Sequence, residues 1–500
     1  PLQRQSLDSF QKAYNEKTKS SKAQTQAARS FMADPRVVTG FKPVIKEMIY
    51  PILVNKSKGS ELWDIDGNHY VDMLNGFGSN FFGYSPDFIT KALKEQIDSG
   101  YELGPQHPLA IEASALATEL TGWDRVAWCN TGSEAVLGAM RIARTVTGRT
   151  RIASFTGSYH GINDEVIIRG TKQLRPLAAA PGIMTAAVQN MLVLDYGTDE
   201  ALKILREQCK DLAAILVEPV QSRRPEFRPI EFLKELRKIT EEHGTLLIFD
   251  EVITGFRYHP GGFAASVGIQ PDLGTYGKVV GGGMPIGMIG GKRQFIDALD
   301  GGHWNFGDSS IPEVGVTYFA GTFVRHPLAL AAAVATMQKL KADGPALQDS
   351  VNKKADRYCS ALNAIFKKYD APYFYANFGS LMKLKINDDA KGYPELLATW
   401  LRNKGVHIWD SFPTFITCAH TDEQIDWVIK QFEDSIREMQ MGGLLGEVSQ
   451  AQTAQYYTDF GMKVAPAHPQ AKLGVDESGQ AAWFIPDPDR PGKFKQIVVD

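Results

Sequence analysis

The sequence predicts an α/β protein with a mostly parallel sheet that helices cover on both faces, followed by a smaller α/β domain. From about residue 105, short apolar runs alternate with stretches of helical periodicity. The runs are continuously apolar, as in strands that are buried on both faces. At 500 residues the chain is too long for one hydrophobic core, so we expect at least two domains.

The composition is that of a globular protein, with 43% hydrophobic and 22% charged residues. The net charge of −3 provides no basic surface for nucleic acid or an anionic membrane, and no apolar run approaches the roughly 18–20 residues of a membrane span. The cysteines are far apart in sequence: Cys129, Cys209, Cys359 and Cys418. We interpret them as reduced thiols of a cytoplasmic protein, and we predict neither a metal site nor a disulfide framework.

The N-terminal segments differ in composition. Residues 1–35 are polar and rich in Gln, Lys and Ser, which predicts a linker or a loosely docked arm. Because they lack an initiator Met, we expect either an excised piece of a longer polypeptide or a trimmed chain. Residues 36–75 are expected to pack with the small domain. In them, 51–54 and 61–68 have the pattern strand, turn, strand, and Asp66-Gly67 suits the positive φ of a tight hairpin.

Residues 76–330 are predicted to form the large domain. Its expected strands are 125–129, 151–155, 191–194, 213–217 and 246–249, and its expected helices are 111–120, 135–146 and 232–243. The carboxyl ends of parallel strands meet at one edge of a sheet, where ligands bind. The residues that follow each strand are therefore the candidates for a functional site.

Residues 331–440 are predicted to form the small domain, entered through a helix over 329–340. Strands are expected at 373–375, 381–384 and 406–408, and a helix capped by Thr421-Asp422 is expected over 425–439. Residues 441–500 are rich in Gln, Ala, Asp and Pro, which predicts a C-terminal extension or linker, and the stretch 485–492 is typical of a linker.

Two short stretches are candidate phosphate sites. Asn130 to Glu134 joins a predicted strand to a predicted helix. Amides at the helix N-terminus and the hydroxyls of Thr131 and Ser133 suit an anion, and Gly132 allows close approach; an ordinary N-cap explains the same residues. Gly321-Thr322 offers a hydroxyl and amides before a helix, and it also fits an ordinary loop.

Two positions after strands are candidates for cofactor contacts. Tyr159-His160 follows the strand 151–155; its aromatic ring suits stacking on a flat cofactor, although both side chains also fit a core. Glu218 ends the strand 213–217. A carboxylate buried there needs a cation or a hydrogen-bond donor, and we expect Arg223 or Arg224 as partner; a surface salt bridge is the alternative.

Asp250 and Lys278 are the strongest candidates. Asp250 follows the apolar run Leu-Leu-Ile-Phe, where its carboxylate suits a protonated pyridine nitrogen or, alternatively, a helix cap. Lys278 is the only charge in the stretch 275–283. A desolvated amine has a lowered pKa and is nucleophilic, whereas most lysines are solvated charges. An acid and a lysine in one closed site suit pyridoxal phosphate between them.

Taken together, these motifs resemble the class III, ornithine/GABA-type, pyridoxal phosphate aminotransferases of fold type I, from about Trp63 to about Ile436. The motifs are Leu62 to Asn68, Asn130 to Ala135, Tyr159-His160-Gly161, Glu218-Pro219-Val220, Asp250-Glu251-Val252-Ile253-Thr254-Gly255-Phe256-Arg257, Lys278 and Gly321-Thr322. Within the class, 405–408 and 419–423 resemble glutamate-1-semialdehyde aminomutase. The resemblance implies a seven-stranded sheet in the large domain.

The resemblance also implies roles for the candidate residues. Lys278 would bind the aldehyde of the cofactor covalently and later move a proton, and Asp250 would hold the ring nitrogen. Tyr159 and Val252 would face the two sides of the ring. The other implied cofactor contacts are Thr131, Gly132, Ser133, His160, Glu218, Gly321 and Thr322. Because Thr322 would reach the phosphate of the neighbouring subunit, the resemblance implies a homodimer.

One stretch departs from the aminomutase, which uses a glutamate of a Phe-Glu-Ala-Gly-Phe stretch to bind substrate. Here 411–415 reads Ser-Phe-Pro-Thr-Phe. The segments 10–36, 221–225 and 486–492 instead resemble aminotransferase domains embedded in hybrid polyketide–peptide synthetases of the iturin and mycosubtilin type, which make lipopeptide antibiotics. Those domains aminate a β-ketoacyl chain on an acyl carrier protein, and glutamine or glutamate is the amino donor that we expect.

This resemblance suggests further substrate contacts. Arg223 or Arg224 would bind the donor carboxylate or the pantetheine phosphate. Phe77 and Phe412 would line the acyl channel, or they pack in the core. Two other functions remain open at this point: a free-standing aminomutase or transaminase of soluble keto acids, and a catalytically dead fold that serves as a docking module.

Overall fold

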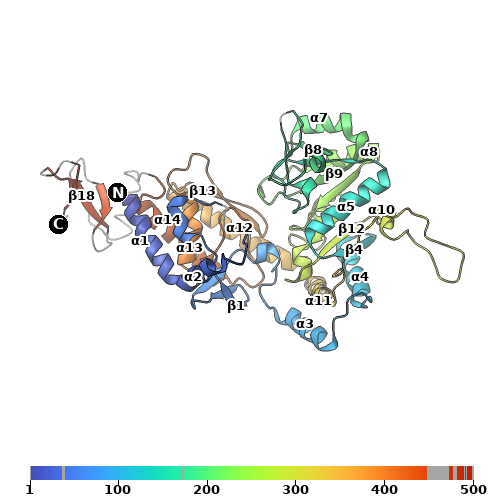
Figure 1. Ribbon diagram of the computed structural model, residues 1–500, viewed down its shortest axis with the longest axis horizontal. Coiled ribbons are helices and arrows are strands. Elements are labelled where there is room, and N and C mark those ends of the chain that lie inside the picture. The colour runs from blue at the N-terminus through green and yellow to red at the C-terminus, as the bar shows by residue number, and fades with distance from the viewer. Residues whose placement is uncertain are drawn as a thin grey trace.

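A computed structural model describes residues 2–36, 40–171, 173–446, 472–476, 481–488, 490 and 492–497. A sheet in the strand order β4-β12-β11-β10-β9-β5-β8 forms the large domain (Figure 1). Its strands are β4 (Arg125–Cys129), β5 (Arg151–Phe155), β8 (Met191–Leu194), β9 (Leu212–Val217), β10 (Leu246–Asp250), β11 (Leu273–Gly277) and β12 (Gly287–Gly291). Neighbours are parallel except at β12, which is antiparallel to β4 and β11. The predicted fold class is confirmed.

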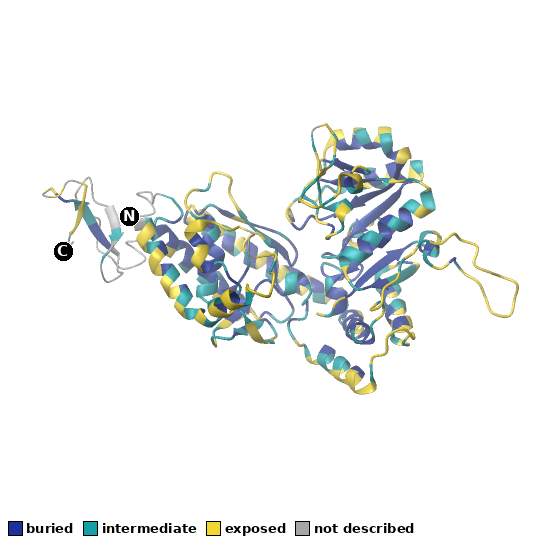
Figure 2. Ribbon diagram, in the orientation of Figure 1, coloured by how far each residue is buried: buried dark blue, intermediate teal, exposed yellow. Residues whose placement is uncertain are grey.

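Helices cover both faces of this sheet. The helix α5 (Gly132–Thr147) packs on one face, and α7 (Asp199–Gln208) and α8 (Ile230–His243) pack on the other. In β10, Leu246 and Ile248 belong to the cluster on the α5 side, whereas Leu247 and Phe249 belong to the cluster on the α8 side. Burial on both faces explains why the strand is continuously apolar, and Figure 2 shows the sheet as buried throughout its centre.

The strands β11 and β12 were not predicted, because glycine weakens strand propensity. Their sequences, Leu-Gly-Thr-Tyr-Gly and Gly-Met-Ile-Gly-Gly, contain five glycines. Packing requires one of them directly. A Cβ on Gly290 would lie 2.2 Å from the indole of Trp123, so only glycine lets this strand pass beneath the tryptophan.

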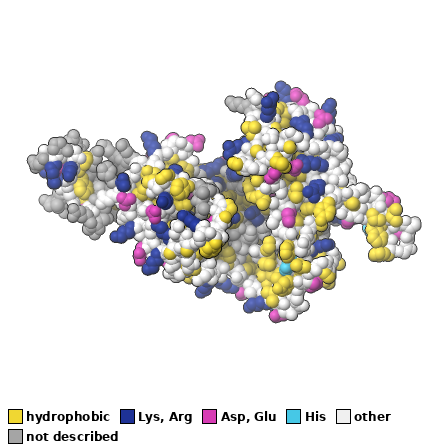
Figure 3. Space-filling view, viewed as in Figure 1, with side chains coloured by type: hydrophobic (Ala, Val, Ile, Leu, Met, Phe, Trp, Pro, Cys, Tyr) yellow, Lys and Arg dark blue, Asp and Glu magenta, His cyan; other side chains and the backbone are white. Residues whose placement is uncertain are grey.

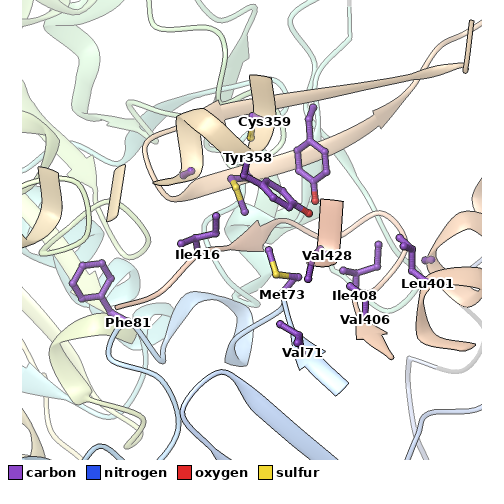
Figure 4. Packing of buried hydrophobic residues seen from close by; sticks show 14 of the residues in the cluster. Val71, Met73, Phe81, Tyr358, Cys359, Leu401, Val406, Ile408, Ile416 and Val428 are labelled. Carbon is purple, nitrogen blue, oxygen red and sulfur yellow. The ribbon is translucent and has the colours of Figure 1, made fainter. Parts of the chain in front are cut away.

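The small domain is formed by residues from both ends of the chain. Its elements are α12 (Pro345–Lys368), β13 (Tyr373–Phe378), β14 (Leu381–Ile386), α13 (Leu397–Asn403), β15 (Val406–His407), β16 (Thr414–Phe415) and α14 (Asp422–Met441). The helix α11 (Pro327–Asp343), which precedes α12, packs on α3 (Asp87–Ser99) and α4 (Leu109–Thr121) of the large domain. The N-terminal strands β1 (Val54–Lys58), β2 (Glu61–Asp64) and β3 (His69–Asp72) join β15 in one sheet. Val71 pairs with Val406, and Figure 4 shows both beside Met73 and Ile408 in the core.

Other elements of the large domain are short or lie at its edges. They are α3 (Asp87–Ser99), α4 (Leu109–Thr121), α6 (Thr185–Val188), α9 (Gly262–Val267), α10 (Arg293–Ile296), β6 (Ile168–Arg169) and β7 (Leu177–Ala178). Among the helices that the structure describes, none has both the length and the apolar character needed to cross a bilayer.

The prediction of a linker or loosely docked arm at residues 1–35 is wrong. This region forms α1 (Leu2–Lys17) and α2 (Lys19–Ala28), packed on the small domain (Figure 1). Phe10 stacks on Trp400 with ring centroids 3.7 Å apart, and Tyr14 is fully buried. The Asp66 carboxylate accepts hydrogen bonds from the first amides of α2, at Ser20 and Ser21. A few large apolar side chains at helical spacing therefore anchor a segment whose composition is polar.

The prediction of a linker at 485–492 is also wrong. The described part of this stretch is the end of β18 (Ala481–Pro486) and the turn between it and β19 (Phe494–Ile497), and both strands form a sheet with β17 (Lys472–Val475). Asp487 pairs with Arg490 across this turn at 2.9 Å. Proline and aspartate suit a hairpin turn as well as a linker. Residues 447–471, for which a linker is also predicted, lie outside the described residues.

Candidate active site

The predicted polar residues gather at one edge of the large sheet. Thr131 follows β4, Tyr159 and His160 follow β5, and Glu218 follows β9, whereas Asp250 ends β10 and Lys278 follows β11. All these strands run in the same direction, so their carboxyl ends share an edge. Residues far apart in sequence thus form one site, at the place where parallel sheets bind ligands.

Asp250 is the centre of a buried hydrogen-bond network. Its side chain is 5% exposed. His160 Nδ1 lies 2.7 Å from one carboxylate oxygen, and the other oxygen accepts bonds from Thr275 Oγ1 at 3.2 Å and the amide of Val252 at 3.1 Å. Because these bonds fix the carboxylate between β5 and β11, Asp250 does not act as a helix cap. His160 Nε2 is buried and has no partner among the described residues.

Lys278 lies immediately after β11 on a short 3-10 turn (Lys278–Gly281) in the left-handed region, with φ 49°. Burial lowers the pKa of its amine to about 8, and the nearby Arg257 cation adds to this decrease. The carboxylates of Asp250 and Glu218 oppose it. The amine is therefore more readily neutral, and hence nucleophilic, near neutral pH than an exposed lysine is.

Arg257, to which sequence reasoning gave no role, lies beside this lysine. It is 1% exposed, and burial lowers the pKa of its guanidinium to about 9. Its Nη1 donates to Ser380 Oγ at 3.2 Å, its Nη2 donates to the Gly78 carbonyl, and the group lies 4.6 Å from the ring centroid of Phe415. Arg257 thus joins the large domain to two other segments. A sequence signal existed: it is the only Lys or Arg between Asp250 and Lys278.

The expected arginine partner of Glu218 is not observed. Its two oxygens accept hydrogen bonds from the backbone amides of Tyr159 at 2.8 Å and Ser222 at 2.7 Å. Arg223 and Arg224 are both exposed, and Arg224 lies over the ring of Phe227. Backbone amides can supply the hydrogen bonds of this buried carboxyl group because the loop after β9 folds back over it. Burial raises its pKa to about 7.

The stretch Asn130–Glu134 is both a helix cap and a candidate anion site. Thr131 Oγ1 accepts from the amide of Glu134 at 3.1 Å, in a capping box at the start of α5. This leaves the amides of Gly132 and Ser133 without an acceptor among the described residues. A Cβ on Gly132 would lie 2.8 Å from Val252. The loop therefore presents two free amides at a helix N-terminus, where an anion binds well.

The remaining predicted residues lie in exposed positions. The side chain of Tyr159 is 51% exposed, in contrast to the buried His160 beside it. Gly321 and Thr322 are exposed on the loop before α11. A Cβ on Gly321 would lie 3.8 Å from the side-chain nitrogen Nδ2 of Asn130. This loop therefore passes close to the candidate phosphate site of its own chain.

The two phenylalanines suggested for the substrate contact each other. The rings of Phe77 and Phe412 are 5.4 Å apart and nearly edge to face. Phe77 belongs to a 3-10 turn (Gly76–Gly78) that contacts the turn carrying Lys278. Both rings also contact Trp409, which sequence reasoning missed. Apolar residues at the mouth of a site give no periodic signal, because they belong to loops.

These residues fit pyridoxal phosphate. Gly132 and Ser133 offer free amides for its phosphate, the buried Asp250 carboxylate suits its ring nitrogen, and Lys278 supplies a desolvated amine. Tyr159 and Val252 would contact the ring. When bound, this cofactor supplies an aldehyde that takes an amino group and a ring that accepts electrons. Asp250 would hold a proton on the ring nitrogen, and Lys278 Nζ would move a proton at the substrate carbon.

Comparisons with known proteins identify the family. The model of the class III aminotransferases matches residues 43–436. A glutamate-1-semialdehyde 2,1-aminomutase of Halalkalibacterium halodurans is 33% identical over 80% of this chain and 94% of its own length.

Solved structures agree with that match. A transaminase with PLP bound has a TM-score of 0.75 at 26% identity, covering 84% of this chain and 97% of its own. A β-phenylalanine aminotransferase of Variovorax paradoxus has a TM-score of 0.76 at 26% identity, covering 89% of this chain and 99% of its own. The chain therefore belongs to the class III aminotransferases, which are pyridoxal phosphate-dependent enzymes.

Proposed function

We propose that this enzyme transfers the amino group of glutamine or glutamate to the β-keto carbon of an acyl chain that an acyl carrier protein presents as a thioester. The observation that carries the proposal is the contact of Phe412 with Phe77, 5.4 Å between ring centroids. Phe412 is the second residue of the stretch in which the aminomutase uses a glutamate. An apolar pair at this place suits an apolar chain better than a short polar semialdehyde.

The exposed arginines support a tethered substrate. Arg223 and Arg224 are exposed on the loop after β9, and an ion pair of Glu226 with Lys385 joins this loop to β14 of the small domain. Arg223 also lies near enough to Lys383 to contribute to the lowered pKa of that amine. We assign one of these two arginines to the pantetheine phosphate or the donor carboxylate, because guanidinium groups bind both anions well.

A homodimer is part of the proposal. The loop 303–316 is exposed along its whole length and extends from the large domain (Figure 1). It carries large apolar side chains, including Phe306 at 92% exposure, and Tyr318 beyond it is 76% exposed; Figure 3 shows apolar side chains gathered on it. A second copy of the chain would cover this surface, and Thr322 would then contribute to the phosphate site of the partner. Phe306→Glu should yield a monomer in analytical ultracentrifugation.

A second candidate function is glutamate-1-semialdehyde aminomutase. The 33% identity to the aminomutase of Halalkalibacterium halodurans favours it. An aminomutase returns the amino group to the same carbon skeleton, so it needs no separate amino donor. The two functions therefore differ in a property that can be measured directly.

A half-reaction distinguishes the two functions. The enzyme is first incubated with glutamine or glutamate, freed of donor, and then offered either a β-ketoacyl carrier protein or glutamate 1-semialdehyde. We expect amination of the carrier-bound chain, detected by mass spectrometry. Turnover of the semialdehyde alone would refute the proposal and establish the aminomutase.

A further inference from the structure

Three aromatic side chains from two distant segments meet beside the turn that carries Lys278. We call Phe77, Trp409 and Phe412 the aromatic clamp. Trp409 lies 5.4 Å from Phe77 and 5.5 Å from Phe412 between ring centroids, and all three pairs are edge to face. Such pairs hold each other in fixed orientations, so the clamp is one preformed apolar surface.

The clamp is not part of the hydrophobic core. Its three side chains are half-buried, and they lie outside the buried clusters formed by the described residues. The guanidinium of Arg36 lies over Phe77 at 4.7 Å and over Trp409 at 5.3 Å. A cation over two rings further stabilises their orientation. Core packing therefore does not account for this surface.

The backbone that presents the clamp is strained in both segments. Phe77 has φ 57° and Ser411, just before Phe412, has φ 65°. Side chains with a Cβ rarely adopt this left-handed conformation, and such residues cluster at functional sites. The strain places Phe77 and Phe412 against each other beside the turn that carries Lys278.

The space behind the clamp excludes one path for a ligand. The pocket lined by Ile408, Trp409, Phe412 and Thr414 has a volume of about 20 Å³, which is room for about one water molecule. This space is too small for an acyl chain, so the surface of the clamp that faces away from it is the one available to a ligand. Trp409 contributes the largest ring to the clamp.

We infer that the aromatic clamp is a binding subsite for the apolar tail of an acyl chain and that Trp409 is the residue that sets the preference for long chains. The inference rests on the proposed function for the identity of the chain. The acyl tail lies on the clamp, and contact with Trp409 distinguishes a long chain from a short one. A short acyl group would bury less apolar surface on the clamp than a long one does.

Binding of unreactive probes tests the subsite independently of turnover. The probes are butanoyl-pantetheine and dodecanoyl-pantetheine, and the measurement is isothermal titration calorimetry on the full chain loaded with cofactor. We expect the wild type to bind the dodecanoyl probe at least about tenfold tighter, because the longer chain buries apolar surface on the clamp. Trp409→Ala should reduce this ratio to about twofold, and Trp409→Phe should preserve most of it.

Two further variants serve as controls for this binding experiment. Trp427 is 39% exposed on α14 and lies outside the site, so Trp427→Ala should retain the wild-type ratio. If Trp409→Ala does not fold, as judged by circular dichroism, Phe412→Ala gives the same test. Equal binding of both probes by the wild type, or an unchanged ratio in the folded clamp variant, would overturn the inference.

The outcomes also separate the inference from the proposed function. Turnover of β-ketoacyl thioesters with no effect of Trp409→Ala on the binding ratio leaves the function standing and removes the subsite. A ratio that depends on Trp409, without turnover of any β-ketoacyl thioester, keeps an acyl subsite and refutes the proposed reaction.

Discussion

The two sides of the site are built in different ways. On the cofactor side, Asp250 and Lys278 directly follow strands of one parallel sheet, and buried hydrogen bonds fix the aspartate. On the side that we propose for the substrate, Phe77 and Phe412 lie in segments from opposite parts of the chain, with strained backbone and half-buried rings. The difference indicates that the fold itself provides the chemistry, whereas specificity is added by loops that can vary without disturbing the sheet.

The largest expected effect lies on the cofactor side. Lys278→Ala removes the amine that would bind the cofactor covalently and move the proton. Transamination should fall by at least about 10³-fold, and the visible absorption of the bound cofactor should change. The exposed Lys234, 53% accessible on α8, provides the control variant Lys234→Ala. Unchanged absorption in Lys278→Ala would contradict the assignment.

The next effect tests the charge beneath the cofactor. Asp250→Asn keeps the shape of the side chain but removes the carboxylate that would keep the ring nitrogen protonated. We expect a loss of about 10²-fold or more in kcat, because the ring then accepts electrons poorly. His160→Gln should cost less, since Thr275 and Val252 still bond to Asp250. Single-turnover kinetics measure both, and an equal loss in the two variants would place the essential group at His160.

A charge placed on the substrate side should change specificity more than chemistry. Phe412→Glu restores an acid to the stretch where the aminomutase uses one. Because a carboxylate against Phe77 is poorly solvated, kcat/KM for a long β-ketoacyl thioester should fall by about tenfold or more. The rate at which the amino donor is consumed in the first half-reaction should change far less. If the rates of both half-reactions fall equally, the residue at position 412 affects the chemistry of the cofactor side as well as the binding of substrate.

These two sides also differ in how far the sequence predicts them. The strand ends are predictable because a buried parallel strand reads as a continuous apolar run and its next polar residue must lie at the ligand edge. The hydrogen-bond donors to Glu218 could not be predicted, since every residue except proline has a backbone amide and the sequence does not show which one donates. The position of Trp409 at the site could not be predicted either, because loop geometry determines its neighbours. Gly290 illustrates a further limit: a residue required by packing against Trp123 weakens the pattern that identifies its own strand.

Arg257 connects the two sides, and its charge should be measurable through pH. It lowers the pKa of Lys278 and also bonds to Gly78 and Ser380. Arg257→Gln removes a cation that disfavours protonation of Lys278, so the pKa of the lysine should rise from about 8. The midpoint of the pH dependence of cofactor capture by the apoenzyme should then rise by about half a pH unit to one.

The matched variant Arg257→Lys retains the positive charge but loses the planar group that bonds to both segments. Its pH midpoint should stay near that of the wild type, whereas its capture rate should fall because the turn carrying Phe77 is less well held. A midpoint that moves equally in both variants would show that the shift comes from altered structure and not from charge.

The smallest effect concerns the support of the substrate side at low pH. His420 Nδ1 accepts a bond from the Thr417 amide at 3.0 Å, and Nε2 lies 2.9 Å from the Asp72 carbonyl. This geometry requires a neutral ring, and burial lowers its pKa to about 4. The unfolded chain takes up the proton near pH 6.5, so the contribution of His420 to stability is complete above that pH and is lost as the pH falls toward 4.

The loss should amount to at most about 3 kcal/mol of unfolding free energy. In His420→Gln this component is absent, so the advantage of the wild type in thermal midpoint should shrink between pH 6.5 and 4. If the stability advantage of the wild type over His420→Gln grows as the pH falls, His420 is protonated in the folded protein. In that case a charged histidine, and not a neutral one, supports the loops of the substrate side.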